Sequence, residues 1–68
     1  MNAGKQVLLD ALRKHRSDAM TKAKELREIA KRQTSKEEAD LYLQQAHEEE
    51  TKAQGYLRHA EILAEAEE

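Results

Sequence analysis

Four charged residues near the middles of the two halves of the chain are the first candidates for chemistry. His15 and Arg16 interrupt an apolar pattern in the first half, and Glu49 and Glu50 interrupt one in the second. Two carboxylates that face an imidazole and a guanidinium can hold a ligand or metal, or form ion pairs that fix how two helices align. We expect the second arrangement, a polar layer that sets the register of a helical bundle.

The spacing of the histidines argues against a metal centre. Bundles that bind two iron ions place a glutamate three residues before a histidine, so that both side chains project inward. None of His15, His47 and His59 has a glutamate at that position. The residues after His47 also lack the second histidine of the zinc-protease spacing. We therefore expect no metal and no cofactor.

Covalent catalysis has equally little support in the sequence. Neither Ser17 nor Ser35 has an ordered base and acid around it, and no glycine-rich loop is present to hold a phosphate. The chain has no cysteine, which excludes thiolate and disulfide chemistry. We expect no catalytic residues and a protein that is not an enzyme.

The elements that must position these residues are two long helices. In residues 39–64 an alanine recurs every seven residues, and larger side chains follow each alanine at spacings of three and four. This pattern is typical of one face of an α-helix in a coiled coil. Small side chains let a partner helix approach near the lower end of the usual ~8–10 Å range. The residues of this helix-packing seam are Ala39, Ala46, Ala53 and Ala60.

Charges and capping residues mark the ends of the helices. We predict a helix at about residues 3–32, a turn at 33–35, a helix at about 36–64 and a frayed acidic tail at 65–68. Thr34 and Ser35 each precede a glutamate by three residues, so either hydroxyl can open a capping box. The tail frays because its carboxylates lie at the negative end of the helix dipole.

So short a turn makes the helices antiparallel neighbours in a single all-α domain of residues 1–68. Residues whose numbers sum to about 67 then lie side by side, which places His15 and Arg16 near Glu49 and Glu50. A core this small rarely stabilises a domain by more than about 3–5 kcal/mol. We therefore expect the hairpin to form a homodimer, a four-helix bundle.

Three residues test how the helices pack. Gly55 costs about 1 kcal/mol relative to alanine inside a helix. It is either a point where another backbone passes closely or an exposed residue of no importance. We expect Tyr42 and Tyr56, the only aromatic residues, to line the seam with their hydroxyls outward.

The charge differs between the two halves although the net charge is only −2. Lysine and arginine predominate in residues 1–34, and acids predominate in residues 35–68. We expect the halves to attract one another as antiparallel partners. The alternative is a nucleic-acid surface on one flank of the first helix. Its residues would be Arg13, Lys24, Arg27 and Lys31, with no aromatic side chain nearby to stack on a base.

Partner binding is the function that these observations favour. Leu41 and Ile62 lie off the alanine seam and are candidates for contact with another protein. We expect a small regulator, inhibitor or adaptor that binds a partner protein stoichiometrically. The alternatives are a regulator that binds RNA or DNA and a purely structural assembly element. No apolar run is long enough for a membrane span or a signal peptide, so we expect a cytoplasmic protein without a membrane partner.

Overall fold

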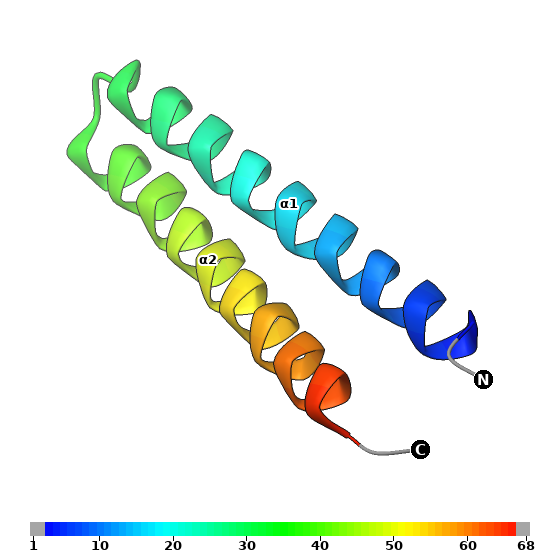
Figure 1. The fold of residues 1–68 in the computed structure, drawn as a ribbon. Coiled ribbons are helices and arrows are strands. Elements are labelled where there is room, and N and C mark those ends of the chain that lie inside the picture. Colours follow the sequence, from blue (N-terminus) through cyan, green and yellow to red (C-terminus); the bar gives the residue numbers. More distant parts are fainter. Residues whose placement is uncertain (1–2, 67–68) are drawn as a thin grey trace.

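The chain folds as a helical hairpin. The computed structural model describes residues 3–66, in which α1 spans Ala3–Lys31 and α2 spans Lys36–Glu65. The two helices run antiparallel along their whole length, so the start of α1 and the end of α2 lie together at the open end of the hairpin (Figure 1). The Cα atoms extend over 54 × 14 × 9 Å, which is the shape of a rod. The predicted all-α hairpin is confirmed.

Side-chain and backbone hydrogen bonds define the turn. The backbone N–H of Arg32 donates to the carbonyl of Ile29 at 3.0 Å, and the Gln33 side chain donates to the same carbonyl at 3.0 Å. Of the two candidate caps, the hydroxyl of Ser35 accepts from the backbone N–H of Glu38 at 3.5 Å. These contacts satisfy backbone groups that both helix ends would otherwise leave without partners.

The open end of the hairpin is tied across the two helices. The ammonium of Lys5, in the first turns of α1, donates to the carbonyls of Ala64 and Ala66 at 3.3 and 2.8 Å. A cation at this position also suits the negative end of the α2 dipole. The predicted frayed tail begins one residue too early, because Glu65 is still helical. Its last two residues, 67 and 68, lie outside the described part of the chain.

Alanines form most of the contact between the helices. Ala46 and Ala53 of the seam are 1% exposed, whereas Ala39 and Ala60 are half-buried. The other buried apolar side chains come from α1, and no large side chain of the described residues is fully buried. They are Leu9, Ala19, Ala23, Leu26 and Ala30. The half-buried ring of Tyr42 packs against the cluster of Ala23, Leu26 and Ala46.

Side chains that contact one another across the hairpin are displaced along α2 from the pairs that we expected. Equal heights would put His15 level with residue 52 and Lys22 level with residue 45. In the structure His15 stacks on Tyr56 and Lys22 pairs with Glu49, in each case four residues farther along α2. Every Cα–Cβ bond tilts toward the N terminus of its own helix, so side chains of antiparallel helices lean in opposite directions. This tilt explains the direction of the displacement, and it accounts for about two of the four residues by which the contacts are displaced.

Gly55 lies on the outer surface of α2. A Cβ atom built on it would have no neighbour within 4 Å. Close passage of the α1 backbone is therefore the wrong explanation for this glycine, and the alternative of an exposed residue holds within the hairpin.

Replacing Gly55 by alanine should stabilise the hairpin by about 0.5–1 kcal/mol, because alanine loses less backbone freedom in a helix. Urea denaturation followed by circular dichroism measures the change. Gly4→Ala is the matched control and should have a smaller effect, because the first turn of a helix is held less firmly. A Gly55→Ala variant less stable than the parent would show that another surface packs on this part of α2.

Replacing Ala46 by leucine should destabilise the protein by about 1–3 kcal/mol, because the added atoms overpack the contact between the helices. Ala11 is exposed on α1, so Ala11→Leu is the control and should leave stability nearly unchanged. Thermal melts of both variants and the parent make the comparison. Equal stability of Ala46→Leu and the parent would contradict a tightly packed alanine seam.

Candidate interaction surfaces

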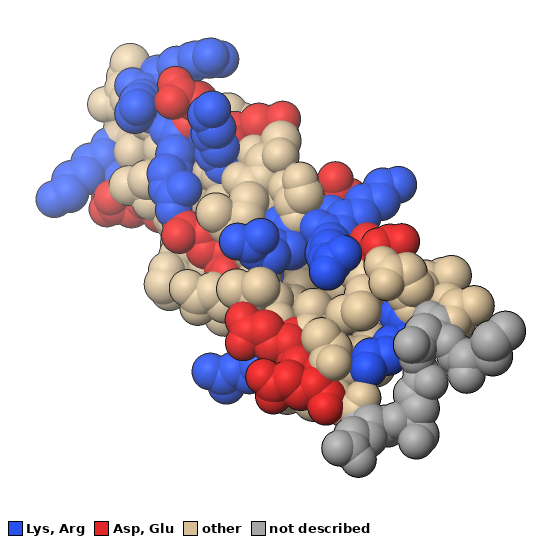
Figure 2. Space-filling view, in the orientation of Figure 1, with Lys and Arg blue, Asp and Glu red and all other residues tan. Residues whose placement is uncertain are grey.

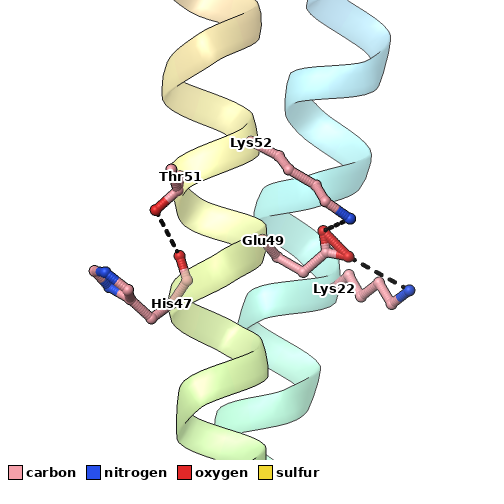
Figure 3. Close-up of polar contacts among 5 residues, drawn as sticks. All are labelled: Lys22, His47, Glu49, Thr51 and Lys52. Atoms are coloured by element: carbon pink, nitrogen blue, oxygen red, sulfur yellow. Dashed lines mark hydrogen bonds and ion pairs between the residues drawn. The ribbon is translucent and has the colours of Figure 1, made fainter.

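A buried carboxylate between two lysines is the most constrained polar group of the hairpin. The Glu49 side chain is 11% exposed, and its two oxygens lie 3.4 Å from Lys22 Nζ and 3.6 Å from Lys52 Nζ. Figure 3 shows Lys22 reaching it from α1 and Lys52 from α2. His47 points away from α1, on the far side of α2, where the Thr51 hydroxyl donates to the His47 carbonyl at 3.0 Å. Glu49 therefore links the two helices and has both of its oxygens occupied by cations.

The partners of the central acids differ from those that we expected. Glu49 pairs with the two lysines, and Glu50 forms an ion pair with Arg27. The pairing of Glu49 and Glu50 with His15 and Arg16 is therefore wrong, because the cations that reach these acids from α1 lie nearer the turn of the hairpin. His15 instead stacks on Tyr56, with ring centroids 5.5 Å apart and planes inclined by 32°.

The sequence offered only part of the signal for this network. Lys52 follows Glu49 by three residues, so their contact on one helix face was predictable. Lys22 could be assigned to Glu49 only once the register was known. Whether these ion pairs fix that register stays a prediction.

The two ion pairs to α1 define two different edges of the rod. We call the edge that carries Arg27 and Glu50 the leucine edge and the edge that carries Lys22 and Lys52 the lysine edge. Seven-residue spacing assigns the remaining members to each edge. The leucine edge comprises Arg13, Met20 and Arg27 of α1 with Leu43, Glu50, Leu57 and Ala64 of α2. The lysine edge comprises Leu8, His15, Lys22 and Ile29 of α1 with Gln45, Lys52 and His59 of α2.

An apolar hollow of about 300 Å³ lies on the leucine edge, toward the open end of the rod. Leucine, alanine and tyrosine side chains form most of its wall, and the three charged residues that line it are Arg13, Arg16 and Glu61. The lining residues are Leu9, Leu12, Arg13, Arg16, Tyr56, Leu57, Ala60, Glu61 and Ala64. Arg16, which was expected in the central polar layer, is exposed here. The arrangement suits contact with an apolar side chain, flanked by groups of both charge signs.

The hollows on the lysine edge have a different character. One is lined by Lys22, Glu48, Glu49 and Lys52 together with Leu26 and Gln45. The other adds His15 and Asp18 to the same central charges. Charged side chains already paired with one another dominate both walls, so this edge is much less suited to apolar contacts.

The basic flank of α1 is largely neutralised by nearby carboxylates. Arg13 lies 3.7 Å from Asp10, Lys31 lies 3.3 Å from Glu28, and Arg27 pairs with Glu50. Lys24 makes no ion pair with any residue in the described range 3–66. In the view of Figure 2 lysine and arginine side chains are interspersed with aspartate and glutamate, without an unbroken basic stripe. The flank is therefore a mixed charged surface.

Leu41 and Ile62, the candidate contacts to a partner protein, are 59% and 62% exposed. They lie 21 residues apart on one face of α2, which corresponds to about 31 Å along the helix. Glu48 and Gly55 occupy the intervening positions of this face at seven-residue spacing. The two side chains are thus separate apolar points on the outer surface.

Replacing Glu49 by glutamine should destabilise the hairpin by about 0.5–1 kcal/mol, because two ion pairs are lost and both lysines are largely exposed. The difference from the parent should shrink in about 1 M salt, where such charges are screened. Urea denaturation at low and high salt provides the measurement. The neighbouring Glu48 is exposed and forms no ion pair within residues 3–66, so Glu48→Gln is the control. A loss of stability that is independent of salt would point to packing of the Glu49 stem as the cause.

Two further features of the described residues bear on the chemistry of the chain. Neither α1 nor α2 is both long and apolar enough to cross a lipid bilayer. Within residues 3–66 no three side chains of histidine, aspartate or glutamate converge as they would around a metal ion.

Comparisons of the chain with protein-family models, with curated proteins and with solved structures returned no significant match.

Proposed function

We propose that the chain is a small, non-enzymatic interaction protein that self-associates and binds a partner protein stoichiometrically, as a regulator, inhibitor or adaptor. The observation that carries this proposal is the exposure of its large apolar side chains. Residues 3–66 contain fourteen valine, leucine, isoleucine, methionine and tyrosine residues. Seven of these side chains are 39–67% exposed, namely Val7, Leu8, Met20, Leu41, Leu43, Leu57 and Ile62. Exposed apolar side chains concentrated on a polar chain favour binding of other macromolecules.

Self-association is the first part of the proposal. Among residues 3–66 no large side chain is fully buried, so little apolar burial offsets the entropy of folding. Packing two hairpins into a four-helix bundle would remove several exposed leucines from water in one step. The absence of cysteine fits a reducing setting such as the cytoplasm.

Binding of a partner protein is the second part. Leu41 and Ile62 stand on the outer face of α2, away from both the seam and the hollow of the leucine edge. Each of these exposed side chains can serve as an apolar anchor in a contact with another protein. Binding of nucleic acid is the weaker alternative, because three of the four cations on the basic flank already form ion pairs with carboxylates.

The replacement of Leu41 and Ile62 by aspartate should abolish capture of the partner protein by the immobilised chain. Thr51→Asp, at another exposed position of α2, is the control and should bind as the parent does. Extracts of the native host with and without nuclease provide the partner. We expect capture to survive nuclease and to depend on Leu41 and Ile62, because truncating apolar anchors removes most of the binding energy of such contacts.

The same experiment has an arm for nucleic acid. Mixed RNA and duplex DNA should show no saturable binding at physiological salt. Binding with a log–log salt slope of about −0.7 per contact for single strands, or −0.9 for a duplex, would contradict the proposal. Its loss in a Lys24→Gln, Arg27→Gln variant would then assign the function to the basic flank.

A further inference from the structure

We infer that a second copy of this chain docks against the leucine edge, along the row of exposed apolar side chains that includes Met20, Leu43 and Leu57. This inference rests on the self-association proposed above and names the surface at which the copies meet. Two independent observations carry it: the exposed area of the hairpin and the difference between its two edges.

The exposed area of the hairpin is too large for a compact monomer. Its accessible surface is 5527 Å² for a mass of 7.8 kDa. A folded monomer of this mass exposes about 4,400 Å² on average, so the hairpin exposes roughly 1,100 Å² more. A stable interface buries about 800 Å² on each partner. The excess is therefore sufficient for one interface of ordinary size with a second copy.

The two edges of the rod differ in what they present to such a copy. Within residues 3–66 the leucine edge has three large exposed apolar side chains, Met20, Leu43 and Leu57, at 44, 46 and 39% exposure. The lysine edge has only Leu8 in this class, and its hollows are lined by the paired charges around Glu49. Docking on the leucine edge removes more apolar surface from water and disrupts no Glu49 ion pair. The leucine edge is thus the favoured face.

This placement leaves the outer face of α2 free. Leu41 and Ile62 belong to a seven-residue series that does not line the hollow, so a dimer built on the leucine edge carries two equivalent copies of this face. Two partner molecules, or two sites on one partner, can then be bound at once, which raises the apparent affinity without any new contact.

Sedimentation equilibrium of matched variants tests the assignment. Leu57→Lys should raise the dimer dissociation constant at least about tenfold, because it places a cation in a buried apolar contact beside Arg13 and Arg16. Ile62→Lys is the same kind of substitution on the same helix but outside the leucine edge, and should change the constant less than about threefold. Equal constants for the two variants would overturn the assignment and leave self-association standing.

A second matched pair gives the test an arm that does not depend on the folding of one variant. Leu43→Lys, on the leucine edge, should raise the dissociation constant as Leu57→Lys does, whereas Leu41→Lys, on the outer face of α2, should change it less than about threefold. A Leu43→Lys chain that dimerises as well as the parent would overturn the assignment. A parent chain that stays monomeric at about 100 µM would overturn both the assignment and self-association. Capture of the partner protein through Leu41 and Ile62 would then still be measurable.

Discussion

The constraint on which the rest of the structure depends is the size of the side chains between the two helices. Ala23, Ala46 and Ala53 are almost completely buried, so the helices meet through methyl groups. Such a contact allows close packing along a long rod, but each alanine removes little apolar area from water. Of the fourteen larger apolar side chains in residues 3–66 only Leu9 and Leu26 are buried, and seven remain largely exposed.

Charges complement this thin contact on both edges of the rod. The basic character of the first half and the acidic character of the second are realised in two ion pairs between the helices, Lys22–Glu49 and Arg27–Glu50. Glu49 also shows why the seam tolerates an acid at a buried position, since a lysine reaches it from each helix. The charge difference between the halves thus contributes to the fold and leaves the basic flank with little unpaired charge.

The functional proposals follow from this division between small, apolar and charged side chains. A seam of alanines leaves several leucines exposed, which is why we propose the leucine edge for a second copy and the outer face of α2 for a different protein. The two surfaces are carried by different seven-residue series of the same helices. Each can therefore be changed without altering the other, and self-association and partner binding can be separated by experiment.

The sequence alone determined the elements of the fold and their approximate ends. The three-four spacing of the seam and the capping hydroxyls of Thr34 and Ser35 are local properties, because helix periodicity and capping involve residues close together in the chain. The register of one helix against the other was decided only by the tertiary structure. His15, which we expected beside Glu49 and Glu50, stacks on Tyr56, and Glu49 pairs with Lys22. The hollow of the leucine edge also depends on that register, because it brings Leu12 and Arg16 of α1 beside Leu57 and Ala60 of α2. No spacing within one helix specifies which residues of another helix stand opposite, and so the local pattern predicted the hairpin but not its surfaces.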